Sequence, residues 1–272
     1  LSGKFTNCGC FGDCIPITPL TSFLKDLVLL VLIALLIGGK KSLMPAISLR
    51  TANYFIFISL IGTLLLQWYA LNYLPPVDCL PFKKGNNIAE QMKPPPNSVP
   101  DSFSIKFIYE KNGKKYEFSP ENLPADFATY KFIDRKQELI RKGNSDPAIK
   151  GFSLAGITGE DSTQVVLNDE NAIVLFLLSN ETSTEWISHF KAVVNNARRK
   201  NIPVYVATSD LSQVSKMLFD NGINVQLFTC DFTVIRTAAR TSPTLYILKK
   251  GTVYKKYSYR KLNNAADAID KL

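Results

Sequence analysis

Two long apolar runs stand near the start of the chain, and a short basic loop separates them. The first covers residues 20–38, and a helix of that length spans about 30 Å, close to the apolar thickness of a bilayer. The second runs from about residue 52 to 74, and aromatic side chains typical of a membrane interface stand at its far end: Trp68, Tyr69 and Tyr73. The pattern therefore predicts two transmembrane helices.

The last hundred residues alternate between short apolar runs and amphipathic segments. Residues 172–178 are continuously apolar, which is typical of a strand buried on both faces. We expect further strands at 203–207, 225–228, 244–248 and 253–259, and helices at 184–200, 211–221 and 263–272. This order predicts an α/β domain with a mixed sheet over residues 171–272.

The region between these parts has a different character. Residues 1–92 form the predicted membrane domain, and a stiff, proline-rich linker covers 93–103. Alternating residues around Asn112 and Gly113 predict a β-hairpin at the start of a lead-in region, 104–170. Within that region, residues 125–145 carry no assignable pattern, and 152–166 suggest a short strand and a turn.

The loop between the two apolar runs carries Lys40, Lys41 and Arg50 and no acidic residue. The positive-inside rule places this loop in the cytoplasm and both outer flanks on the opposite side. Lys25 and Asp26 lie in the first turns of the first predicted helix, and we expect them to form an ion pair at the membrane edge. The chain begins at Leu1 in a polar loop, so we expect it to be N-terminally truncated and preceding helices to be missing.

Composition narrows the chemistry further. The chain has 272 residues, a net charge of +9, five cysteines and one histidine. No basic block is interleaved with aromatic residues, so a nucleic-acid partner is not expected. We expect the single histidine, His189, to be a surface residue. The three clustered cysteines lack a fourth ligand, so no metal site is expected there.

Three of the cysteines, Cys8, Cys10 and Cys14, lie within seven residues just before the first apolar run. A closed Cys-x-Cys pair is strained and readily reduced, so Cys8 and Cys10 are a candidate redox pair. Cys14 and Cys79 are candidate resolving partners, since all four lie on the same side of the membrane. A structural disulfide within this loop or to Cys79, or free thiols, are the alternatives. Cys230 reads as a small packed residue.

The first part of the chain resembles the DoxX/MauE family of small helical-bundle membrane proteins. The resemblance covers residues 1 to about 92 and rests on Cys-Gly-Cys-Phe-Gly at 8–12, Phe-Leu-Lys-Asp at 23–26 and Leu-Pro-Pro-Val-Asp at 74–78. This part of the chain is similar to the Bacteroidetes members of the family that carry a periplasmic tail. The resemblance implies disulfide formation in periplasmic partners, or quinone-coupled redox chemistry.

The C-terminal domain resembles thioredoxin, through Thr241-Ser242-Pro243-Thr244 ahead of a strand pair. The resemblance implies that Pro243 follows a cis peptide bond and that Thr241, Ser242 and Pro243 form a peptide-docking loop. A redox-active thioredoxin has Cys-x-x-Cys after its first core strand, but residues 179–184 here read Ser-Asn-Glu-Thr-Ser-Thr. Without a thiolate this domain is expected to be redox-inactive by itself.

Together these observations predict a multi-pass protein of the bacterial inner membrane, with its C-terminal domain in the periplasm. The leading hypothesis is thiol–disulfide chemistry on a periplasmic protein client through Cys8 and Cys10. A quinone, as the membrane carrier that re-oxidises the pair, is the one candidate cofactor. One alternative is a non-enzymatic envelope anchor with structural cysteines and a partner-binding thioredoxin-like domain. Another is a quinone-linked oxidoreductase without protein clients.

Overall fold

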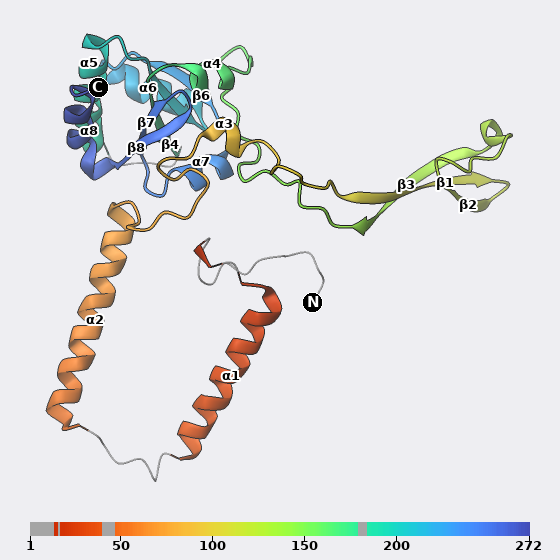
Figure 1. Cartoon of the computed structure of the whole chain (residues 1–272), viewed down its shortest axis with the longest axis horizontal. Coiled ribbons are helices and arrows are strands. Elements are labelled where there is room, and N and C mark those ends of the chain that lie inside the picture. The colour runs from red at the N-terminus through yellow and green to blue at the C-terminus, as the bar shows by residue number, and fades with distance from the viewer. Residues whose placement is uncertain (1–13, 16, 40–46, 179–183) are drawn as a thin grey trace. The chain divides into compact units, whose positions relative to one another are not determined.

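The computed structural model describes residues 14–15, 17–39, 47–178 and 184–272. The chain divides into two compact units (Figure 1). One unit combines Leu1–Ala89 with Gly151–Leu272, and the other is Glu90–Lys150. Cys8 and Cys10 lie outside the described residues.

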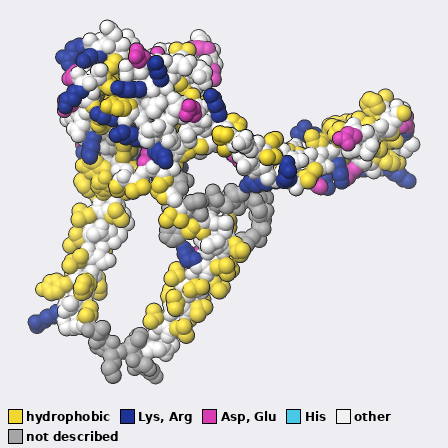
Figure 2. Space-filling view, in the orientation of Figure 1, with side chains coloured by type: hydrophobic (Ala, Val, Ile, Leu, Met, Phe, Trp, Pro, Cys, Tyr) yellow, Lys and Arg dark blue, Asp and Glu magenta, His cyan; other side chains and the backbone are white. Residues whose placement is uncertain are grey.

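Two apolar helices open the first unit. Helix α1 covers Pro19–Gly38 and α2 covers Leu49–Asn72, so both agree with the predicted spans to within three residues. The side chains of Thr18 and Ser48 accept hydrogen bonds from backbone N–H groups of the first turns, which fixes where each helix begins. Both helices are long and apolar enough to cross a membrane. Their apolar side chains are exposed along their length (Figure 2).

The C-terminal part of this unit is an α/β domain with a five-stranded mixed sheet in the order β6-β5-β4-β7-β8. Strands β4, β5 and β6 run parallel, whereas β7 and β8 run antiparallel to their neighbours. The strands are β4 Ala172–Leu177, β5 Val204–Thr208, β6 Gln226–Thr229, β7 Thr244–Lys249 and β8 Thr252–Ser258. The helices are α5 Glu185–Arg199, α6 Leu211–Asp220, α7 Phe232–Ala238 and α8 Leu262–Ile269, with a 3-10 turn, η4, at Tyr259–Lys261. This is the thioredoxin-like fold that the sequence predicts.

Both faces of this sheet are covered, which explains the uninterrupted apolar sequence of β4. On one face, Ile173, Leu175 and Leu177 pack in a core with side chains of α5, α6 and α8. On the other face, the Phe176 ring lies 4.9 Å from the Tyr246 ring and 6.3 Å from the Phe152 ring, between centroids. All six residues of β4 are buried.

The segment that follows α2 covers the outer edge of β8. The N–H of Gly85 donates to the carbonyl of Val253, and the N–H of Val253 donates to the carbonyl of Asn86, at 2.8 and 2.9 Å. Phe82 and Ile88 are buried against the domain. The chain itself therefore occupies the start of this sheet edge, around Val253, and blocks pairing with another strand there.

Two details differ from the sequence-based expectation. The strand expected in 152–166 is wrong: Ala155 makes only isolated bridges, and Thr163–Asn168 forms a short helix, α4. Asp161 starts that helix by accepting a hydrogen bond from the Thr163 N–H at 2.9 Å. Helix α7 has no counterpart in the prediction, and Asp231 caps it by accepting from the N–H groups of Thr233 and Val234.

The unit Glu90–Lys150 carries a three-stranded antiparallel sheet in the order β2-β1-β3. Its elements are β1 Ser102–Lys111, β2 Lys114–Phe118, β3 Lys131–Arg141 and the 3-10 turn η3 Phe127–Thr129; a short helix, α3 Ile88–Gln91, lies at the boundary of the two units. Asn112 and Gly113 both have positive φ, at 53° and 73°, as a two-residue hairpin turn requires. Strand β3 lies within the region that the sequence left unassigned.

Candidate functional site

A disulfide joins Cys14 to Cys79 across 65 residues of chain. Cys14 precedes α1 by five residues, and Cys79 follows α2 by seven. The bond therefore ties the start of the first apolar helix to the end of the second, and both ends lie on the same side. Cys14 is exposed and Cys79 is half-buried. The structure thus brings two of the four predicted site cysteines together.

Asp78, next to this bridge, is held by the thioredoxin-like domain. Its carboxylate lies 2.7 Å from the ammonium of Lys256 on β8 and accepts a 3.1 Å hydrogen bond from the N–H of Leu80. The Lys256 side chain is only 6% exposed, and its ammonium lies 4.9 Å from the centroid of the Tyr246 ring. Burial lowers the pKa of Lys256, against the opposing effect of Asp78. Cys79 is consequently fixed between two residues anchored in the domain.

The end of α2 makes a second contact with the same domain. The Asn72 side-chain oxygen accepts hydrogen bonds from the Tyr259 hydroxyl at 2.6 Å and from the Arg260 Nε at 3.2 Å. Arg260 also pairs with Glu185 in the first turn of α5 at 3.2 Å. His189 is half-buried and lines a cavity of about 150 Å³ beside Arg260. The helix end, the disulfide and the domain thus form one connected region.

The loop ahead of β7 has the cis peptide bond at Ser242-Pro243 that the thioredoxin resemblance implies. The Ser242 hydroxyl accepts a 3.2 Å hydrogen bond from the N–H of Leu178, at the end of β4. The Thr241 and Thr244 hydroxyls lie 3.2 Å apart. Thr241 and Pro243 are buried, and Ser242 is half-buried. Of the predicted docking residues, Ser242 alone presents part of its surface.

The thioredoxin-like domain lacks a reactive thiol. Residues 179–183, where the nucleophilic pair of a thioredoxin would stand, lie outside the described part of the chain, but their sequence contains no cysteine. The domain's one cysteine, Cys230, is 2% exposed, and its N–H donates to the Thr208 carbonyl at 2.9 Å. Burial raises the pKa of the Cys230 thiol to about 12. Cys230 is the packed residue that the sequence suggests, and it is protonated at neutral pH.

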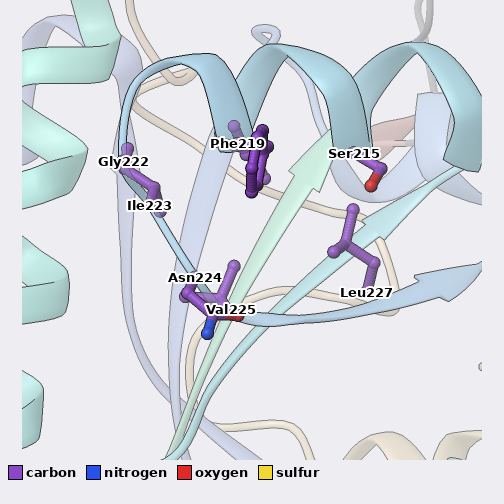
Figure 3. Close-up of a pocket in the computed structure, with 8 residues that line it drawn as sticks. Ser215, Phe219, Gly222, Ile223, Asn224, Val225 and Leu227 are labelled. Atoms are coloured by element: carbon purple, nitrogen blue, oxygen red, sulfur yellow. The ribbon is translucent and has the colours of Figure 1, made fainter.

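Another cavity lies between α6 and the segment that leads into β6 (Figure 3). It measures about 330 Å³, and its walls include Phe219, Ile223, Val225 and Leu227. None of the side chains lining it is ionisable or a thiol, so it offers no group for acid–base or thiol chemistry. Among the described residues, no cluster of three or more His, Cys, Asp or Glu side chains could hold a metal ion.

Sequence reasoning identified the cysteines but missed Asn72, Asp78 and Lys256. Asp78 precedes Cys79 directly, which is the one local signal that could have drawn attention to it. Lys256 lies 178 residues further along the chain, and a single sequence gives no sign of such a pairing.

Comparison with known proteins gives one match to a family model and several matches to solved structures. Residues 103–142 match the model of a domain of unknown function, DUF8463. That segment lies outside residues 1–92, so the DoxX/MauE resemblance stays a prediction. No curated protein matches the chain.

Several solved structures resemble the C-terminal domain. A thiol:disulfide interchange protein from Bacteroides sp. is 8% identical, with a TM-score of 0.37, and the match covers 44% of this chain and 84% of that one. A thiol-disulfide oxidoreductase from Bacteroides fragilis is 16% identical, with a TM-score of 0.36 and coverage of 44% and 96%. Yeast Sco1 is 16% identical, with a TM-score of 0.35 and coverage of 44% and 90%. At these identities and TM-scores, the matches carry no argument about activity.

Proposed function

We propose that this chain is a membrane-anchored thioredoxin-fold protein that performs thiol–disulfide exchange outside the cytoplasm, with Cys8 and Cys10 as the reactive pair. One observation carries the proposal. Of the five cysteines in the sequence, Cys14 and Cys79 are bonded to each other and Cys230 is buried with a raised pKa. The remaining two are Cys8 and Cys10, which stand four to six residues ahead of the bridge.

The Cys14–Cys79 bond also supports the proposed orientation. Because it links the outer flanks of α1 and α2, the two flanks lie on one side, and the loop with Lys40, Lys41 and Arg50 lies on the other. Basic loops between spans stay in the cytoplasm. The bonded cysteines then face an oxidising compartment, where disulfides persist. In a bacterium this arrangement corresponds to an inner-membrane protein with a periplasmic domain.

The exchange needs two steps. A thiolate of the client attacks one sulfur of a Cys8–Cys10 disulfide, which forms a mixed disulfide and releases the other sulfur as a thiolate. The second client thiolate then attacks the mixed disulfide, so that the client leaves oxidised and the pair is left as a dithiol. We propose a membrane quinone as the oxidant that restores the pair, taking up two electrons and two protons to become a quinol.

In this scheme the thioredoxin-like domain binds the client and does not react with it. Thioredoxin-fold domains present the loop that carries the cis-proline to extended peptides, and Ser242 lies in that loop here. Cys79 is fixed to the domain through Asp78 and Lys256, which holds the domain close to the outer flank of the helices.

Cysteine trapping tests the proposal on the full chain in membranes. In a Cys10→Ala variant, the Cys8 thiolate can attack the disulfide of an oxidised client, which is the second step in reverse. Cys10 is then absent and cannot attack the mixed disulfide to release the client. We expect a reductant-sensitive adduct with a protein client on a non-reducing gel, mapped to Cys8 by mass spectrometry. The matched control is the Cys8→Ala, Cys10→Ala double variant, which keeps the Cys14–Cys79 bridge. Equal adduct in both variants, or none in either, contradicts the proposal.

A second candidate function is a non-enzymatic envelope anchor, and one observation favours it. The Cys14–Cys79 bond joins two helix flanks and Cys79 is held in place by neighbours on both sides, as expected of a structural staple. In that case the domain is a binding module whose surface around Ser242 docks a partner. A Cys8–Cys10 bond that persists under strong reductant, with no trapped client, supports this candidate.

A further inference from the structure

A small cavity opens where the end of α2 meets the last strand of the thioredoxin-like domain. It measures about 130 Å³ and is lined by Tyr69, Tyr73 and Leu74 from the helix end and by Lys256, Tyr257, Ser258 and Lys261 from the domain. A single water needs about 10–15 Å³ of such volume. The cavity therefore has room for a polar group of several heavy atoms.

The charge around this cavity is positive. Strand β8 and the turn η4 carry Lys255, Lys256, Arg260 and Lys261 within seven residues, with no acidic residue between them. Asp78 neutralises Lys256, and Glu185 neutralises Arg260. Figure 2 shows that Lys and Arg side chains are frequent on the face of the domain in view.

Lys261 is the cation that remains available at the cavity. Among the described residues, no carboxylate lies within 4.0 Å of its ammonium, which is positioned 5.6 Å from the centroid of the Tyr73 ring. An ammonium held over an aromatic face keeps its charge and its hydrogen-bond donors for another partner.

Ser258 supplies a second, independent sign of an unfilled polar site. It is 1% exposed, lines the same cavity, and its hydroxyl has no hydrogen-bond partner among the described residues. Buried hydroxyls in folded proteins are nearly always paired, because leaving one unpaired costs free energy. Ser258 is therefore a polar residue of the cavity wall whose hydroxyl no other described residue satisfies.

The position of the cavity at the end of α2 indicates which ligand to expect. Trp68, Tyr69 and Tyr73 stand together at the helix end, and the Tyr69 and Tyr73 rings stack with centroids 5.2 Å apart. Aromatic side chains gather at the headgroup level of a bilayer. If α2 crosses the membrane, the cavity lies at the depth of the lipid phosphates.

From these contacts we infer that the cavity between α2 and β8 is a binding site for the phosphate of an anionic phospholipid headgroup, with Lys261 as its principal cation. This inference rests on the membrane anchoring in the proposed function and does not depend on the cysteine chemistry. Such a lipid would hold the thioredoxin-like domain against the membrane surface. A lysine near a membrane surface contributes about 1 kcal/mol to the binding of anionic lipid.

The test uses the purified full chain, delipidated in detergent and then offered phosphatidylglycerol or phosphatidylcholine, with retained lipid counted by native mass spectrometry. We expect wild-type protein to retain phosphatidylglycerol in preference to phosphatidylcholine, and Lys261→Ala to lower that preference about fivefold. The matched control is Lys216→Ala, which removes an exposed lysine on α6, outside the cavity, and should leave the preference unchanged.

Three outcomes overturn the inference. One is an unchanged preference in Lys261→Ala together with a lower melting temperature, which would assign Lys261 to stabilising the carbonyl end of α2. Another is an equal loss in both lysine variants, which would indicate diffuse charge. The third is binding of inorganic phosphate with no preference between the two lipids, which would assign the site to free phosphate. Alkaline extraction of wild-type membranes is run beside them, because release of the protein there contradicts the proposed anchoring and not the site alone.

Discussion

The ammonium of Lys256 and the carboxylate of Asp78 form an ion pair 2.7 Å long beside the Cys14–Cys79 bridge, and the Lys256 side chain is almost wholly buried. An ion pair in such a place contributes little net stability, but removing one partner leaves a desolvated charge behind. The pair therefore fixes position more than it adds stability. It holds the segment after α2 against β8 of the thioredoxin-like domain.

Removing Asp78 should consequently destabilise the domain more than removing Lys256. We expect Asp78→Ala to cost about 3 kcal/mol of unfolding free energy, because the Lys256 ammonium stays buried without its carboxylate. Lys256→Met should cost about 1 kcal/mol, because the methionine refills the apolar stem and Asp78 keeps the Leu80 N–H. Urea unfolding followed by tryptophan fluorescence measures both.

The control for this pair is Glu185→Ala, which removes the carboxylate of a largely exposed ion pair with Arg260. Exposed pairs contribute about 0–1 kcal/mol, so the loss should stay below that of Asp78→Ala. The double variant Asp78→Ala, Lys256→Met should be more stable than the sum of the two single losses implies. Additive losses would show that the two side chains do not act as a pair.

The disulfide assignment is tested by mapping the bonded peptides. A non-reduced digest of the full chain should give one linked peptide that contains Cys14 and Cys79, and this product should remain in a Cys8→Ser, Cys10→Ser variant. It should vanish in Cys14→Ser. Recovery of Cys14 linked to Cys8 or Cys10 would show that the cluster is bonded internally, and the account of the reactive pair would then be wrong.

The sequence predicted the thioredoxin-like sheet because its signals are local. Residues 172–177 are an unbroken apolar run, and the following helix α5 places Trp186, Phe190 and Val193 on one buried face. Both patterns follow directly from burial on two faces of a strand and on one face of a helix. The sequence of each of these elements is therefore enough to predict it.

The elements that the sequence missed lack such a signal. All residues of β3, Lys131–Arg141, are exposed, so no face of the strand requires apolar side chains and no alternation appears. Helix α7 has seven residues, too few for a helical period to separate from an apolar run. The partners of the candidate site, Asp78 with Lys256 and Asn72 with Tyr259, meet only after folding, across more than 170 residues.

Cys230 gives a prediction about alkaline pH. Because burial raises the pKa of its thiol to about 12 from 9.0, the folded protein keeps a proton that the unfolded protein releases between these values. Stability should therefore fall as pH rises above 9, by at most about 1.4 kcal/mol per pH unit. Cys230→Ala should lose this part of the pH dependence.

The measurement compares wild type and Cys230→Ala in urea from pH 8 to 11. Lys256, whose pKa is lowered by burial, titrates in both proteins and cancels in the difference. The same burial predicts that a maleimide at pH 7.5 labels Cys230 only after unfolding. Rapid labelling of the native protein would show that the thiol is accessible, and Cys230 would then become a third candidate for exchange.

Tyr246 gives a prediction about the loop that precedes β7. Its hydroxyl donates a 2.8 Å hydrogen bond to the carbonyl of Ala238, the last residue of α7, and the side chain is fully buried. Tyr246→Phe leaves that carbonyl without its donor, so we expect a loss of about 1–2 kcal/mol. Hydrogen exchange should rise in residues 238–243, since the hydrogen bond between α7 and the strand is lost.

Tyr254→Phe, at a side chain 37% exposed, is the matched control and should change stability by less than about 0.5 kcal/mol. Equal effects of the two substitutions would mean that the Tyr246 hydroxyl does not hold the end of α7 in place.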